Sequence, residues 1–142
     1  MCLALFVASD EPVHASAGWN GTAALSFHPL AAADAWVRNV LSKPYVMYVG
    51  SHTGCSCGFA FGLIEPRTDA EAEEEARGRQ SVAALRELLE TRLAGAREVQ
   101  LLACWAGNEG SLPGPSQTVG LDYFGGDEFQ FPERAVIMVR RA

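Results

Sequence analysis

At 142 residues, with 49% hydrophobic and 20% charged residues, the chain has the size and composition of one soluble globular domain. A formal net charge of −6, with no cluster of Lys or Arg, argues against binding to nucleic acid or to anionic membranes. The four cysteines follow no export signal, and no apolar run approaches the roughly 20 residues that span a bilayer, so we expect a cytoplasmic protein with reduced thiols.

The first third of the chain contains three predicted strands. A short apolar run at residues 2–8 has no basic residues before it, which favours a strand over a signal peptide. Residues 12–22 are rich in Gly, Pro and Asn and predict a loop. A second strand is expected at 24–28 and a third at 45–49, where β-branched and aromatic residues follow one another. Residues 34–41 have helical spacing, but the segment is too short to distinguish a helix from irregular structure.

The middle of the chain contains the main predicted helix. Its apolar stripe predicts a helix at about 79–94 and consists of Val82, Leu85, Leu88, Leu89 and Leu93. The acidic run before it, within about 66–78, has no apolar face. It is expected to be a solvated loop insertion or a frayed helical turn, and not a metal site. Strands are predicted on both sides, at 59–64 and 98–104. These two strands would be parallel if the helix forms a crossover between them.

The C-terminal part predicts an antiparallel meander, with short strands at 119–124, 128–131 and 135–139. We see no linker or internal repeat that would divide residues 1–142 into two domains. The predicted fold is therefore a single α+β domain. It has a mostly antiparallel sheet of about six to eight strands, with one amphipathic helix packed on it.

Residues 50–58 concentrate the groups that could carry chemistry. Within this glycine-rich segment, His52, Cys55 and Cys57 have the spacing H-x-x-C-x-C, and Cys104 ends a separate apolar strand. Zinc binds thiolate and imidazole ligands, and copper(I) also prefers sulfur, so these four residues are candidate metal ligands. The second Cys-x-x-Cys-like pair of ordinary structural zinc sites is missing.

The same residues could instead perform thiol chemistry. Backbone amides in a glycine-rich turn can lower the pKa of a cysteine, with His52 as base or as cationic partner. Cys55 and Cys57 are then the candidate catalytic thiols, one attacking and the other resolving. A disulfide between residues i and i+2 is strained and therefore labile. Acyl transfer by a Cys–His pair would also need a third, orienting group, for which Asn108 and Asp122 are candidates.

A third candidate is Cys2. The Met1-Cys2 start is similar to that of the class II glutamine amidotransferases, whose mature enzymes begin with cysteine. This resemblance covers two residues and implies an N-terminal nucleophile that uses its own amine as base. Cys2 is also the first residue of a predicted buried strand, and the chain is shorter than that fold requires.

Three classes of function therefore remain open. The first is a binding or regulatory module whose site is the loop 50–58, with zinc or copper(I) as ligand. The second is a thiol-dependent enzyme or redox protein that uses the same loop. In the third, the cysteines are ordinary core residues, the glycines serve a turn, and the acidic segment contacts a basic protein partner. The sequence does not say whether a partner would be a second copy of this chain.

Overall fold

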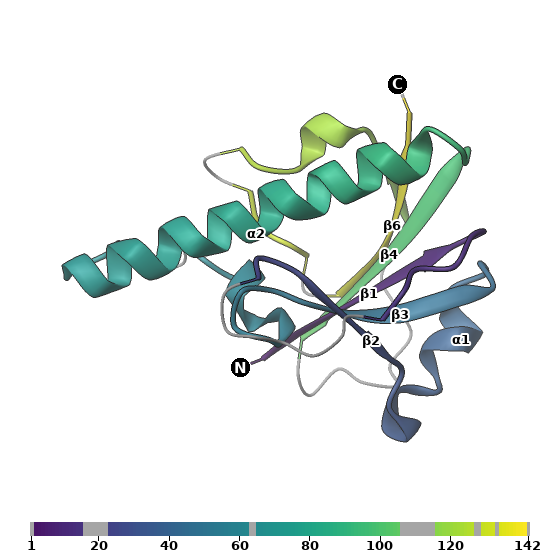
Figure 1. Cartoon of the computed structure of the whole chain (residues 1–142), viewed down its shortest axis with the longest axis horizontal. Helices are drawn as coiled ribbons and strands as arrows, with labels where there is room; N and C mark the ends of the chain where they lie inside the picture. Colours follow the sequence, from purple (N-terminus) through teal and green to yellow (C-terminus); the bar gives the residue numbers. More distant parts are fainter. Residues whose placement is uncertain are drawn as a thin grey trace.

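Six strands form one mixed sheet in the order β2-β3-β1-β4-β6-β5 (Figure 1). The computed structural model describes residues 2–15, 23–62, 65–105, 116–126, 129–132 and 134–141. All neighbouring strands are antiparallel except β5 and β6, which are parallel. The strands are β1 (Leu3–Ser9), β2 (Ser26–Pro29), β3 (Tyr45–Gly50), β4 (Glu98–Trp105), β5 (Gln117–Val119) and β6 (Arg134–Arg140).

The two central strands, β1 and β4, are buried along nearly their whole length. They pair from Leu3 opposite Trp105 to Ala8 opposite Gln100. Continuous apolar runs of this kind are expected where a strand is covered on both faces. Predicted strands 2–8, 45–49, 98–104 and 135–139 are confirmed, and the α+β fold class is confirmed with them.

Helix α2 (Asp69–Leu93) covers one face of the sheet. Its buried side chains Val82, Leu85, Leu89 and Leu93 contact the sheet, as the apolar stripe predicted. Figure 1 shows that the beginning of α2 extends past the strands. Nearly all of its first nine residues, 69–77, are exposed. No helix in the described part of the chain is long and apolar enough to cross a membrane.

The prediction of an acidic loop at 66–78 is wrong, because α2 begins at Asp69, ten residues before the predicted start. Thr68 caps the helix by accepting a hydrogen bond from the Glu71 amide, and the Glu71 carboxylate accepts one from the Arg67 amide. Acidic residues in the first turn also interact favourably with the helix dipole. Two i,i+4 ion pairs reduce repulsion within the run: Glu73–Arg77 and Glu75–Arg79.

The opposite face of the sheet carries a smaller apolar cluster under the short helix α1 (Val37–Val40). A 3₁₀ turn, η1 (Ala32–Asp34), precedes α1, so the segment 34–41 is partly helical. Val37 and Leu41 pack here against Phe6, Leu102 and Val136. The sheet therefore has a large core on the α2 face and a minor one on the α1 face.

The predicted strand at 59–64 is wrong in its described part. A 3₁₀ turn, η2 (Ser56–Phe59), stands there, residues 60–62 are not in a strand, and residues 63 and 64 lie outside the described residues. The parallel crossover from this strand into 98–104 is wrong with it. Phe59 is 1% exposed and packs edge-to-face on Phe131, so its burial comes from anchoring the turn in the core.

The antiparallel meander predicted at the C-terminus is also wrong. Only residues 117–119 form the next strand, β5, and β5 is parallel to β6. A 3₁₀ turn, η3 (Leu121–Tyr123), follows β5. Residues 129–131 are not in a strand, and residue 128 lies outside the described residues. The aromatic residues that resembled strand positions instead form a cluster around Phe124, Phe129 and Phe131.

Candidate functional site

The loop that follows β3 folds back on itself through close backbone contacts. The Ser51 amide donates to the Cys55 carbonyl at 2.7 Å, and the Gly54 amide donates to the Ser51 carbonyl at 2.9 Å. Gly54 has φ 85°, which favours glycine over any residue with a side chain. A Cβ on Gly50 would lie 2.5 Å from the Gly54 carbonyl oxygen. The glycines of this segment are therefore explained by its tight turn.

The loop sits directly against α2 because two further glycines have no side chains. A Cβ on Gly58 would lie 2.5 Å from the His52 ring, and one on Gly78 would lie 2.7 Å from the Gly58 carbonyl oxygen. Both distances are shorter than real contacts allow. Gly78 is also the first buried residue of α2, so the helix reaches the rest of the protein at this point.

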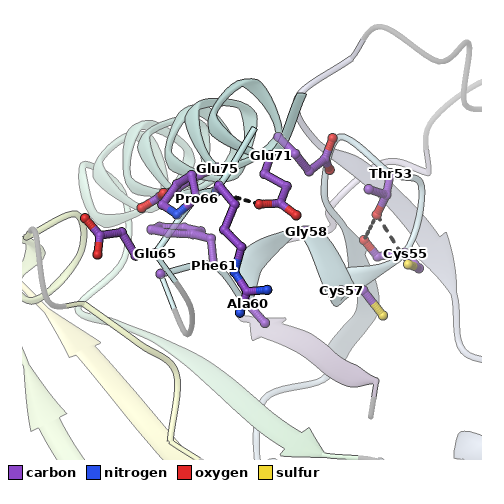
Figure 2. Close-up of a pocket in the computed structure, with 13 residues that line it drawn as sticks. Thr53, Cys55, Cys57, Gly58, Ala60, Phe61, Glu65, Pro66, Glu71 and Glu75 are labelled. Carbon is purple, nitrogen blue, oxygen red and sulfur yellow. Dashed lines mark hydrogen bonds between the residues drawn. The ribbon is translucent and has the colours of Figure 1, made fainter. Parts of the chain in front are cut away.

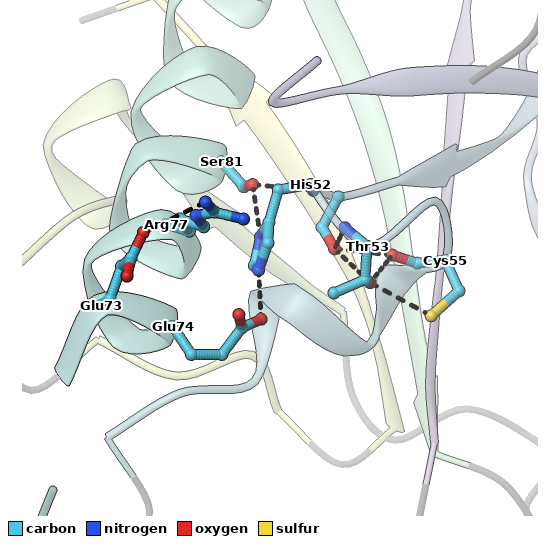
Figure 3. Close-up of polar contacts among 8 residues, drawn as sticks. His52, Thr53, Cys55, Glu73, Glu74, Arg77 and Ser81 are labelled. Atoms are coloured by element: carbon cyan, nitrogen blue, oxygen red, sulfur yellow. Dashed lines mark hydrogen bonds and ion pairs between the residues drawn. The ribbon is translucent and has the colours of Figure 1, made fainter. Parts of the chain in front are cut away.

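His52 fastens the loop to α2 through both ring nitrogens (Figure 3). Its Nδ1 lies 3.1 Å from the Ser81 hydroxyl, which also accepts a hydrogen bond from the His52 amide at 3.0 Å. Its Nε2 contacts the Glu74 carboxylate. Ser81 is fully buried, so it holds the imidazole in place and has no access to a substrate.

Ser56 bridges β1 and β3 where the two strands separate. Their pairing stops at Phe6 opposite Tyr48. Beyond that point the Ser56 hydroxyl accepts a hydrogen bond from the Leu5 amide at 2.9 Å and donates one to the Val49 carbonyl at 2.6 Å. The Ser56 amide donates to the Tyr48 hydroxyl. This fully buried serine therefore replaces a strand-to-strand contact and fixes the position of its neighbours Cys55 and Cys57.

Cys55 has the chemistry of an activated thiol. Its sulfur lies 3.3 Å from the Thr53 hydroxyl, and Cys57 supplies further hydrogen bonds from its backbone and side chain. Burial raises the pKa of Cys55, but these hydrogen bonds together outweigh burial and bring the pKa below its ordinary value. The thiolate is the nucleophilic form of cysteine, so Cys55 is the more reactive of the two loop thiols.

Cys57 has the opposite character. Burial, hydrogen bonds to the side chains of Cys2 and Cys55, and the negative charge of those thiols raise the pKa of Cys57 to about 12. Cys57 therefore stays protonated at neutral pH. Cys2, which precedes β1, is exposed. Its predicted role as an N-terminal nucleophile stays a prediction.

A pocket of about 590 Å³ opens between the loop and the projecting half of α2 (Figure 2). Figure 2 shows Cys55 and Cys57 at one end and Glu65 at the other, with Phe61 and Pro66 between them. The volume is in the range of small-molecule sites. The lining has one cationic residue, Arg67. It is outnumbered by the acidic residues Glu65, Glu71, Glu74 and Glu75.

The four predicted metal ligands are not brought together. Cys104 is buried and pairs with Ala4 on the α1 face of the sheet, whereas Cys55 and Cys57 line the pocket on the α2 face. His52 is engaged by Ser81 and Glu74. Within the described ranges, no group of three or more His, Cys, Asp or Glu side chains is arranged to hold a metal ion. Zinc or copper(I) binding stays a prediction.

Several residues of the site were not predicted from the sequence. The carboxylate on His52 belongs to Glu74, whereas Asp122 is exposed in η3 and Asn108 lies outside the described residues. Glu74 and Ser81 are 22 and 29 residues from His52 in sequence, so no local pattern connects them. Thr53 could have been found, because a hydroxyl two residues before a cysteine is within local hydrogen-bonding reach.

Comparison with family models, with curated proteins and with solved structures finds no match for this chain.

Proposed function

We propose that this protein is a thiol–disulfide exchange protein in which Cys55 is the attacking thiol. The observation that carries the proposal is a thiol of lowered pKa at the wall of a pocket large enough for a small disulfide or the side chains of a peptide. A second thiol, Cys57, stands two residues further along the chain and lines the same pocket. A nucleophilic thiol, a resolving thiol and a binding pocket are the components that exchange requires.

The first step forms a mixed disulfide. The Cys55 thiolate attacks one sulfur of the substrate disulfide, a sulfur–sulfur bond forms to Cys55, and the other half of the substrate leaves as a thiolate that takes a proton from water. The Thr53 hydroxyl donates to the Cys55 carbonyl at 3.2 Å and lies 3.3 Å from the Cys55 sulfur, so by turning it donates to the thiolate and stabilises it. The lowered pKa of Cys55 raises the fraction of thiolate that is available before the substrate arrives.

In the second step Cys57 releases the bound half of the substrate. Cys57 loses its proton to water and attacks the Cys55 sulfur, so the remaining substrate half leaves as a second thiolate and both cysteines are oxidised. Disulfides between residues i and i+2 are strained and easily reduced. The oxidised site is therefore reactive toward other thiols. We keep the cytoplasm, where thiols are held reduced, as the expected location of such a protein.

The pocket indicates which substrates fit. Phe61 and Pro66 provide an apolar surface beside the thiols, and the surrounding carboxylates favour neutral or cationic groups over anionic ones. His52 has a positioning role in this scheme. Its contacts with Ser81 and Glu74 hold the segment from Thr53 to Cys57 against α2.

The test is stopped-flow or mass-spectrometric measurement of exchange between the reduced protein and 2-hydroxyethyl disulfide. Wild-type protein should form a mixed disulfide on Cys55 and then release it. Cys57→Ser should trap the mixed disulfide, and Cys55→Ser should react at least about tenfold more slowly. Cys104→Ala is the matched control, since this thiol is buried away from the pocket. Equal rates for wild type and Cys55→Ser would refute the proposal.

A further inference from the structure

The inward face of α2 changes from apolar to acidic where the helix leaves the sheet. The buried residues of α2 begin at Gly78. Glu71, Glu74 and Glu75 precede Gly78 by seven, four and three positions, so they lie on the same face of the helix. All three line the pocket. The projecting half of α2 therefore gives the pocket a wall of carboxylates, which continues the stripe by which the other half packs on the core.

Beside this carboxylate wall the pocket is apolar. Figure 2 shows Phe61 and Pro66 between the thiols and Glu65. Phe61 lies directly against α2, since a Cβ on Gly78 would be 2.7 Å from its ring. Lys and Arg side chains combine an apolar stem with a charged end. They therefore match a surface on which apolar side chains lie beside a row of carboxylates.

Arg79 of the protein itself already makes such contacts on this surface. Its guanidinium lies 5.0 Å from the centre of the Phe61 ring, and it pairs with the Glu75 carboxylate at 3.0 Å. The surface thus holds an arginine by an aromatic ring and a carboxylate together. A basic side chain from another molecule would find the same two kinds of partner further along the wall.

The wall retains capacity for such a ligand. Glu71 accepts a hydrogen bond from the Arg67 amide, and Glu74 contacts His52 with 56% of its own side chain exposed. A carboxylate has about four lone-pair positions, so both can accept further hydrogen bonds from a cation. Arg67 is the single cationic residue of the lining and does not balance the wall.

We propose that the pocket and the projecting half of α2 form a docking groove for a basic peptide segment of a protein substrate, which presents its disulfide to Cys55. This inference rests on the proposed exchange function and names its substrate class. The charge of the wall selects Lys and Arg, and the apolar surface beside it takes their stems.

The length of the projecting half favours a peptide over a small disulfide. Residues 69–77 of α2 rise about 13 Å at 1.5 Å per residue, which about four residues of extended chain cover (Figure 1). Lys or Arg within about four positions of the substrate cysteine should therefore reach the wall. A small disulfide bound at Cys55 would leave most of the wall uncovered.

Docking can be measured without exchange, by fluorescence anisotropy of the reduced Cys55→Ser chain with two cysteine-free peptides. One peptide alternates Lys and Ala, and the other alternates Glu and Ala. At low salt the Lys peptide should bind at least about tenfold more tightly than the Glu peptide, and its affinity should fall as salt rises to about 1 M. Equal affinities for the two peptides would overturn the inference.

Two charge-reversal variants of this Cys55→Ser chain locate the binding. Glu65→Lys, at the end of the pocket, should weaken binding of the Lys peptide at least about fivefold. Glu87→Lys makes the same change of charge at an exposed position of α2 outside the pocket lining, and should weaken binding less than about twofold. Equal weakening by both variants would assign the binding to net charge and would also overturn the inference.

The outcomes separate the two proposals. If the Lys peptide does not bind while the wild-type protein forms a mixed disulfide with 2-hydroxyethyl disulfide, the docking groove is refuted and the exchange function stands. If the Lys peptide binds as expected but Cys55 of the wild-type protein forms no mixed disulfide, the proposed function fails and the groove remains a binding site for basic peptides.

Discussion

Ser56 shows how a single side chain builds this site. Its hydroxyl connects the Leu5 amide to the Val49 carbonyl in the space where β1 and β3 would otherwise continue their ladder. Both backbone groups are thereby satisfied in a fully buried position. The serine thus allows β3 to end and the thiol loop to begin without leaving buried polar groups unpaired.

We therefore predict that Ser56→Ala destabilises the fold by about 2 to 3 kcal/mol, because one buried donor and one buried acceptor lose their partner. Urea unfolding followed by circular dichroism measures the change in the free energy of unfolding. Ser116→Ala, at an exposed position, is the control and should change it by less than about 0.5 kcal/mol. A Ser56→Ala variant as stable as the control would show that the bridge is not important.

The candidate thiols could be predicted from the sequence, but their different characters could not. Cys55 and Cys57 stand out by composition alone, because they share a short segment with His52 and three glycines. What distinguishes them is the Thr53 hydroxyl at one sulfur and the Cys2 thiol at the other. Cys2 and Cys57 are far apart in the sequence, so sequence spacing carries no information about their interaction.

At the scale of elements, α2 combines two halves with different sources of stability. The half from Gly78 onward is held by its apolar stripe, which the sequence pattern revealed. The first half has no buried side chains and depends on the Thr68 cap and the Glu–Arg pairs. Apolar periodicity does not predict the first half of α2, because that half has no apolar stripe. The Thr68-x-x-Glu71 capping pattern and the i,i+4 Glu–Arg pairs do indicate a helix there.

Gly78, between the two halves, gives an unusual prediction. In an ordinary helix interior, Gly→Ala stabilises by about 1 kcal/mol. Here the added Cβ would lie 2.7 Å from the Gly58 carbonyl oxygen, which is backbone and cannot easily move. We expect Gly78→Ala to destabilise the protein by about 1 to 2 kcal/mol, since overpacking outweighs helix propensity.

Thermal or urea unfolding of Gly78→Ala measures this effect, and exchange kinetics with a disulfide show whether the loop has shifted. Gly95→Ala is the control, because a Cβ there meets nothing within 4 Å. Stabilisation by Gly78→Ala would mean that the helix and the loop are not in the close contact described above.

At the scale of the whole molecule, the sequence predicted strands well and their arrangement poorly. Long apolar runs identify β1, β3, β4 and β6 because such runs need burial whatever their neighbours are. Strand order depends on which strands pair, and the apolar pattern of a strand does not identify its neighbours. The strand β5 has only three residues, so its sequence gives no indication that it pairs with β6 in parallel. Phe59 and Phe61 have the apolar character of strand residues, but Phe59 is buried in the η2 turn and Phe61 lies against Gly78 of α2.

The negative charge of the molecule should favour cationic disulfides over anionic ones as substrates. The chain carries a formal net charge of −6, and several of its carboxylates line the pocket. At low salt we expect cystamine, which is cationic, to react with Cys55 roughly tenfold faster than oxidised glutathione, which is anionic. The difference should shrink near 1 M salt, where the Debye length falls to about 3 Å.

A pair of charge-matched variants locates the effect. Glu65→Gln, in the pocket, should reduce the preference for cystamine, whereas Glu87→Gln, exposed on α2 outside the pocket lining, should leave it nearly unchanged. Equal reduction by both variants would assign the preference to net charge and not to the pocket.

The central claim is that Cys55 is an activated thiol, and site-resolved alkylation across pH tests it most directly. Iodoacetamide labelling from about pH 6 to about pH 11, read by mass spectrometry, gives the pKa of Cys55 and shows whether Cys57 stays unlabelled over that range. Because the pKa of Cys55 is lowered and that of Cys57 is raised to about 12, Cys55 should be labelled first and Cys57 only in strong base. Thr53→Val should raise the pKa of Cys55. A Cys55 that titrates at or above the ordinary thiol value, or together with Cys57, would contradict the account.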